Sequence, residues 1–219
     1  MYHKIRQGEH LSGIARLYGF HDYETIWRHP ENAKLRKRTS PNILLPGDSL
    51  FIPEKTAKSL SRNTDSRHSF RLSTRPLSLR IVLERQFEKP VAGAPCELLM
   101  DLDRTPLVTS GEGELDQPIR AFDVEATLSV RETAEGHGGT VTADWELPLR
   151  IGYLDPIDEP SGWLGRLANL EYYRSPVNAE PDADELLSAV EEFQCDNHLA
   201  VDGVCGPQTQ AKLKSVYGC

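Results

Sequence analysis

The spacing of apolar residues changes twice along this chain of 219 residues, and the change limits the folds that the chain can adopt. Near both ends apolar residues recur every three to four positions, which is typical of amphipathic helices. Between residues 76 and 154 they alternate with polar residues, which is typical of strands with one buried face. The sequence therefore predicts a multidomain α+β protein with helices in its first and last parts and strands between them.

Two polar, turn-forming stretches separate these parts. Residues 56–75 are Ser-rich and lack apolar periodicity, which predicts a linker. Leu154–Pro160 carries two prolines among acidic residues, where alternation gives way to helical spacing. The predicted domains are residues 1–55, 76–154 and 155–219, with the linker at 56–75.

The first domain has the pattern of a βααβ fold. A short strand is predicted at residues 3–6, and the helix after it ends at Gly19, where a helix C-terminus needs a positive φ. Asp22 is placed to cap a second helix. Pro46–Asp48 predicts a tight turn before a closing strand at Leu50–Pro53.

The middle domain predicts an antiparallel β-sandwich. Apolar and polar residues alternate in Leu77–Glu84, Cys96–Leu102 and Val141–Ile151, and turn clusters separate these runs. Residues Pro90–Leu98 resemble the second-strand region of immunoglobulin-like or transthyretin-like sandwich repeats. That resemblance implies two packed antiparallel sheets.

The last domain predicts a three-helix bundle. Ser161 is placed to cap the first helix, and Asp182 with Glu185 makes a capping-box-like start for the second. Gly206–Pro207 opens the third helix, and Gly218 follows its end.

The first domain resembles a LysM domain over nearly its whole length, in Gln7–Ala15, Tyr18–Gly19 and Pro41–Pro53. The resemblance implies a βααβ fold that binds N-acetylglucosamine-containing polymers in a shallow groove between two loops. Glu9–His10 stands where the family usually has Asp-Thr, which puts glycan binding by this copy in doubt. The alternative is that the loops only pack the fold. The candidate glycan-binding residues are Gly8, Glu9, His10, Leu11, Asn42, Ile43, Leu44 and Leu45.

The last domain resembles a three-helix peptidoglycan-binding domain, in Val190–Gln194 and Leu199–Thr209. The resemblance implies binding to the cell wall. The alternative is an inert or repurposed fold, because the glycines and the proline of this stretch also suit a turn and a helix start. The second set of wall-binding candidates is Phe193, Gln194, Asp202, Gly203, Gly206 and Thr209.

The charge distribution agrees with an anionic partner for the first domain. The net charge is −8, yet residues 1–55 carry nine Lys and Arg against six Asp and Glu. A basic segment suits a polymer such as cell wall, and no Arg-rich and aromatic-rich patch suggests nucleic acid. The alternative is that the charges only solvate helix faces.

No known catalytic or metal-binding motif occurs. The histidines lack His-Glu-x-x-His spacing, and no Gly-x-Ser-x-Gly is present. The sequence therefore predicts a protein without enzymatic activity, cofactor or metal. The four cysteines are expected to be reduced thiols, and Cys195 with Cys205 is the pair to test if a disulfide forms.

The order of the three domains is similar to that of proteins associated with type VI secretion and contractile injection spike modules. This resemblance predicts a peptidoglycan-binding adaptor that anchors or orients a secretion component at the cell wall. The alternative is a structural adaptor that joins spike, effector or tail proteins and has lost glycan binding. Without an apolar leader or membrane span, the chain is expected to be made in the cytoplasm and, if it leaves, to be delivered to the periplasm or envelope by a secretion machine.

Overall fold

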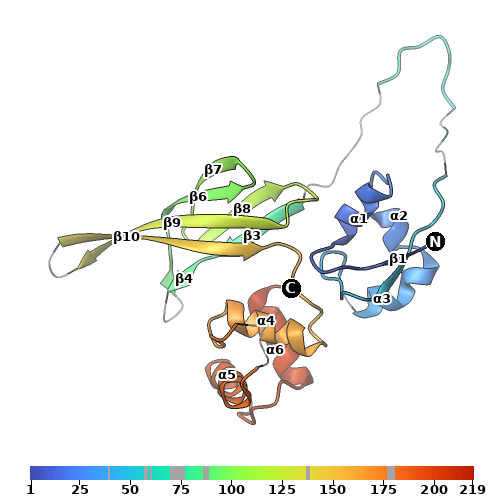
Figure 1. Cartoon of the computed structure of the whole chain (residues 1–219). Helices are drawn as coiled ribbons and strands as arrows, with labels where there is room; N and C mark the ends of the chain where they lie inside the picture. The colour runs from blue at the N-terminus through green and yellow to red at the C-terminus, as the bar shows by residue number, and fades with distance from the viewer. Residues whose placement is uncertain are drawn as a thin grey trace. The chain divides into compact units, whose positions relative to one another are not determined.

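The computed structural model describes residues 1–38, 40–56, 59, 61–69, 77–85, 89–136, 139–176 and 181–219, without the side chains of 133–141. The chain divides into two compact units. Figure 1 labels their helices and strands. The first combines Met1–Leu11, Glu24–Pro53 and Gly152–Cys219, and the second combines Ser12–Tyr23 and Glu54–Ile151. Much of the N-terminal segment therefore shares a unit with the C-terminal helices. The predicted linker lies outside the described residues at 57, 58, 60 and 70–75, and independent folding of the predicted domains stays a prediction.

The N-terminal segment contains the predicted strand–helix–helix–strand order with further helical turns. Strand β1 (Tyr2–Lys4) pairs antiparallel with β2 (Ser49–Phe51). Between them in sequence lie α1 (Leu11–Leu17), α2 (Glu24–Trp27), the 3₁₀ helix η1 (Pro30–Asn32) and α3 (Ala33–Arg38). Gly19 has a φ of +71°, as predicted for the end of the first helix. The LysM assignment of this segment stays a prediction.

Asn32 joins the helical turns of this segment to its closing strand. Its amide Nδ2 donates to the carbonyls of Ile26 and Phe51 at 2.8 and 2.9 Å, and its Oδ1 accepts from the Phe51 N–H at 2.8 Å. The side chain is buried, so these hydrogen bonds satisfy groups that would otherwise lack a partner.

Strands β3 to β10 lie in the second unit, and their pairings among the described residues are antiparallel. A four-stranded sheet has the order β10-β9-β6-β7, and two-stranded pairs are formed by β3 with β8 and by β4 with β5. The bounds are β3 (Leu77–Val82), β4 (Glu84–Arg85), β5 (Lys89–Pro90), β6 (Pro95–Met100), β7 (Asp103–Val108), β8 (Glu114–Ile119), β9 (Glu125–Gly136) and β10 (Gly139–Arg150).

One apolar core lies between these sheets. Leu98 and Leu128 of the four-stranded sheet and Leu115 of β8 are buried in it, and Leu79 and Ile81 of β3 pack against it. Burial alternates along β3, as the period of two predicted. The immunoglobulin-like or transthyretin-like sandwich assignment stays a prediction.

The C-terminal segment folds as three helices, α4 (Pro160–Asn169), α5 (Ala183–Asp196) and α6 (Pro207–Tyr217). Their shared core consists of Leu164, Leu167, Tyr173, Ala189, Val190, Phe193 and Leu213. The predicted cap of the second helix is confirmed, because the Asp182 carboxylate accepts from the backbone N–H groups of Asp184 and Glu185 at 2.9 and 3.0 Å.

The predicted cap of α4 is wrong. The helix begins at Pro160 with Glu159 as its N-cap residue, and no side chain caps it. Proline suits the first turn because its missing N–H would have no partner there. The Ser161 hydroxyl instead donates to Asp155 Oδ2 at 2.7 Å, which ties the start of the helix to the segment before it.

Candidate glycan-binding sites

The two predicted N-terminal loops lie side by side. The Leu11 N–H donates to the Pro41 carbonyl at 2.9 Å, which joins the first loop to the start of the second. Within the first loop the Glu9 carboxylate accepts from the Arg6 N–H at 2.9 Å and lies 2.8 Å from His3 Nε2. Glu9 therefore serves the turn of its own loop.

Most of the predicted contact residues in these loops are buried. Gly8, His10, Leu11, Ile43 and Leu44 have little exposed surface, whereas Glu9 and Leu45 are half-buried and Asn42 is exposed. Leu11, Ile43 and Leu44 were predicted to be apolar platforms for a sugar. In this conformation they are buried and contribute to the fold, and their role as sugar platforms stays a prediction.

The first loop is covered by the chain's own Gly152–Tyr153. The ring of Tyr153 lies so close to Gly8 that a Cβ added there would be 3.1 Å from Tyr153 Cε2. A Cβ at Gly152 would lie 2.8 Å from the Gly8 carbonyl oxygen, and the Gln7 side-chain amide donates to the Tyr153 carbonyl at 3.3 Å. Both glycines have positive φ, +81° and +82°. Glycine at both positions is needed for this backbone approach.

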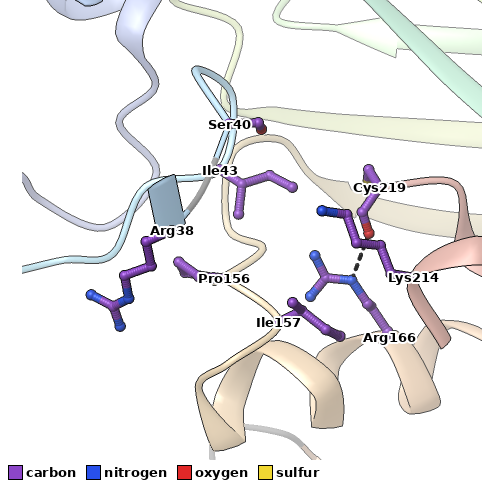
Figure 2. Close-up of a pocket in the computed structure, with 8 residues that line it drawn as sticks. All are labelled: Arg38, Ser40, Ile43, Pro156, Ile157, Arg166, Lys214 and Cys219. Atoms are coloured by element: carbon purple, nitrogen blue, oxygen red, sulfur yellow. Dashed lines mark hydrogen bonds between the residues drawn. The ribbon is translucent and has the colours of Figure 1, made fainter. Parts of the chain in front are cut away.

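The second loop borders a small cavity shown in Figure 2. Ile43 and Ser40 lie on one side, and Pro156, Ile157, Arg166 and Lys214 come from the C-terminal segment. The cavity measures about 70 Å³. Small-molecule sites usually have roughly 300–1,000 Å³. A sugar residue therefore does not fit between Ile43 and the C-terminal segment as they stand.

Arg38, the last residue of α3, makes ion pairs with the segment that leads into α4. Its guanidinium lies 2.8 Å from Asp158 Oδ2 and 3.2 Å from Asp48 Oδ2, and it also pairs with Glu159. The hydrogen bond to Asp158 is the main cause that raises the pKa of Arg38, and the charges of the three carboxylates raise it further. Asp158 and Glu159 are distant from Arg38 in the sequence, so no local pattern could predict these ion pairs.

In the second predicted site, Gln194 organises the turn between α5 and α6. Its buried amide Nε2 donates to Asp202 Oδ1, the Val204 carbonyl and Thr209 Oγ1 at 2.8, 3.1 and 3.0 Å. Its Oε1 accepts from the backbone N–H groups of Asp202 and Gly203, both at 3.0 Å. Gln194 therefore uses its donors and its acceptor on the turn itself.

Phe193, Gln194 and Thr209 are buried, and their role as wall contacts stays a prediction. Phe193 belongs to the helical core, and Thr209 bonds to Gln194. Asp202 is exposed, and Gly203 and Gly206 are partly exposed. The predicted residues therefore do lie together around one turn, and the larger side chains among them hold that turn in place.

Apolar side chains surround the exposed part of the turn. Val201, Val204 and Leu187 are 54%, 61% and 46% exposed. Leu187 packs on Gly203, since a Cβ at that glycine would lie 2.2 Å from Leu187 Cδ1. We call Leu187, Val201, Asp202 and Val204 the turn surface. Its three apolar members were not among the predicted wall-binding residues.

Asp202 makes the turn sensitive to acid. The hydrogen bond from the Val204 N–H is the main cause that holds the pKa of the Asp202 carboxyl below its ordinary value, and the hydrogen bond from Gln194 lowers it further. A lowered carboxyl pKa contributes stability above the unfolded-state pKa of about 3.9, and that stability is lost as the pH falls through the folded-state pKa. Asp202→Asn keeps an oxygen acceptor, so its melting temperature should fall less between about pH 5 and about pH 3 than that of the wild type. Thermal melts followed by circular dichroism check this, and equal falls would contradict it.

Arg166 fixes the base of the helical module. It is buried, and it donates to the carbonyls of Cys219, Asp155 and Gly162 at 2.9, 3.0 and 2.6 Å. Burial lowers the pKa of this guanidinium. The burial of Arg166 could not be predicted from the sequence. The carbonyls that replace water around its guanidinium come from three separate places in the chain.

Metal ligands, thiols and long apolar helices are the remaining features to report for the described residues. Among them, no group of three or more His, Cys, Asp or Glu side chains is arranged to hold a metal ion. The four cysteines are free thiols, and burial raises the pKa of Cys205 to about 11. Within the described part of the chain no helix has the length and apolarity to cross a membrane.

Comparison with known proteins identifies the C-terminal helices. A family model described as a peptidoglycan binding domain matches residues 165–213, which include α5, the second half of α4 and most of α6. No curated protein and no solved structure matches the chain. The match confirms the sequence-based recognition of a peptidoglycan-binding domain in the last segment and suggests a role in cell-wall binding.

Proposed function

We propose that this protein is a non-catalytic adaptor that binds the cell wall through its C-terminal helical module. The observation that carries the proposal is the match of residues 165–213 to a peptidoglycan binding domain. The helices of that region share one apolar core, and Gln194 holds the turn that carries the recognised sequence.

The turn surface is the part of this module that we assign to the polymer. It places two exposed valines and a half-exposed leucine beside the Asp202 carboxylate. Peptidoglycan offers sugar C–H faces and lactyl methyl groups for the apolar side chains, and amide N–H groups for the carboxylate. Sites that combine apolar contact with a few fixed polar groups suit such a ligand.

Substitution of Val204 tests this assignment. Val204→Gln removes apolar contact from the turn surface without adding charge, and we expect binding to purified sacculi to weaken by about 1–2 kcal/mol, roughly five- to thirtyfold in Kd. Co-sedimentation of the full chain with sacculi measures the change.

Val216→Gln is the matched control, because Val216 is also exposed, at 46%, but lies near the end of α6. At 1.5 Å per residue it is roughly 14 Å along the helix from Pro207. The control should bind sacculi as the wild type does. Equal binding by both variants would place the contact elsewhere on the module.

The adaptor part of the proposal rests on the order of the domains, which is similar to that of proteins associated with secretion spike modules. In that role the N-terminal segment, with its LysM-like sequence, would contact a secretion component at the cell envelope. The burial of Ile43 and the cover over Gly8 favour protein contacts over sugar binding at its two loops. Co-purification with a spike protein in the absence of sacculus binding would instead support a purely structural adaptor.

A further inference from the structure

Three rings meet at the surface of the N-terminal segment. Tyr2 of β1 and Phe51 of β2 are cross-strand partners, with ring centroids 5.3 Å apart and an interplanar angle of 71°. The ring of His29, the residue before η1, lies 4.5 Å from that of Phe51 at 30°. We call these three residues the aromatic corner. Its elements belong to the segment coloured blue in Figure 1.

The aromatic corner is held in place by hydrogen bonds from buried and neighbouring groups. Asn32 binds both the N–H and the carbonyl of Phe51. The Tyr2 hydroxyl donates to Glu31 Oε2 at 3.0 Å, and His29 Nδ1 accepts from the Glu31 N–H at 3.3 Å. A surface whose side chains are already ordered loses little conformational entropy when it binds a ligand.

Tyr2 is the exposed member of the aromatic corner, whereas His29 and Phe51 are partly buried. Tyr2 is 61% exposed although its ring is fixed against Phe51. An aromatic side chain buries most of its surface when its role is to stabilise a core. A fixed and exposed ring with a polar edge is typical of surfaces that recognise flat, partly apolar ligands.

The chemistry of the corner fits a sugar ring. One face of a β-linked N-acetylhexosamine carries axial C–H groups that pack on aromatic rings, and its edge carries hydroxyl and acetamido N–H donors. Glu31 is exposed beside Tyr2, and a carboxylate has about four lone-pair sites, of which the Tyr2 hydroxyl takes one. Glu31 can therefore accept from a sugar hydroxyl or acetamido group while it still holds Tyr2.

We propose that the aromatic corner of Tyr2, His29 and Phe51, with Glu31 at its edge, is a second binding site for the glycan strand of peptidoglycan. This inference rests on the proposed function for the choice of ligand. The same chain carries the peptidoglycan-binding match, and a polymer held at one site is presented to the other at raised effective concentration. The corner recognises sugar rings and needs no peptide stem.

The test uses a β-1,4-linked N-acetylglucosamine hexamer, which lacks peptide stems, titrated into the full chain by calorimetry. Tyr2→Ala should weaken hexamer binding at least about tenfold, because a central tyrosine of such a surface carries much of the affinity. Tyr2→Phe keeps the ring and should bind within about threefold of the wild type. Tyr2 is exposed, so neither substitution disturbs a core.

Phe122→Ala is the matched control, since Phe122 is 62% exposed and belongs to the other compact unit. It should bind the hexamer as the wild type does. Hexamer binding that Tyr2→Ala leaves unchanged, or a wild type that binds no hexamer, overturns the inference. If sacculus binding still depends on Val204 in either case, the proposed function stands without this second site. If hexamer binding depends on Tyr2 but sacculus binding does not depend on Val204, the site proposed at the turn surface fails instead.

Discussion

Replacing Gly162 by alanine should destabilise the first compact unit by about 2 kcal/mol or more, although alanine is the better helix former. A Cβ at this position in α4 would lie 1.8 Å from the Pro156 carbonyl oxygen and 2.8 Å from that of Asp155. Both are backbone atoms, so no side chain can turn aside to make room. The segment that Arg166 and Arg38 hold in place would have to move.

Gly165→Ala provides the comparison within the same helix. A Cβ there would lie 3.5 Å from Leu154 Cδ1, which is ordinary van der Waals contact with the end of a flexible side chain. This substitution should gain up to about 1 kcal/mol from helix propensity. Chemical denaturation of the two variants should therefore place them about 3 kcal/mol apart. Similar stabilities would mean that residues 155–156 do not lie against α4 as described.

Features of the fold that depend on near neighbours were predictable from the sequence. Asp182 caps α5 because its carboxylate needs only the N–H groups two and three residues ahead. Gly218 follows α6 with a φ of +93°, which glycine adopts without strain. The alternation of burial along β3 likewise follows from a period of two.

Features that depend on distant segments were not predictable in the same way. The cover over Gly8 is formed by Gly152 and Tyr153, and no periodicity links these positions. Arg166 occupies a helical position that a charged residue usually exposes, yet three carbonyls bury it. The Ser161 prediction failed because α4 already begins at Pro160, which leaves Ser161 inside the first turn of the helix.

The recognised peptidoglycan-binding sequence combines both kinds of information. Its glycines and proline suit the turn and the start of α6, so the fold of the module could be predicted from them. Its larger residues were expected to contact the wall, but Phe193, Gln194 and Thr209 are buried. The proposed ligand surface instead uses exposed residues of the same stretch, such as Val201 and Val204, which were not among the predicted site residues.

Replacing Gln194 by leucine should have the other large effect, a loss of about 3 kcal/mol or more. Leucine is close to glutamine in size but supplies none of the five hydrogen bonds that the amide makes to Asp202, Gly203, Val204 and Thr209. Each buried polar group left without a partner costs about 1–3 kcal/mol, and water can reach only the exposed part of the turn. Chemical denaturation with fluorescence detection measures the loss.

Gln208→Leu controls for the change of residue type, because Gln208 is exposed on α6 and should tolerate leucine within about 0.5 kcal/mol. The pair also separates the two roles considered for Gln194. If Gln194 acts through the turn, Gln194→Leu should lose sacculus binding together with stability, and stabilising osmolytes that refold the module should restore much of the binding. A variant that keeps wild-type stability while losing sacculus binding would show that the Gln194 amide touches the polymer directly, contrary to its burial.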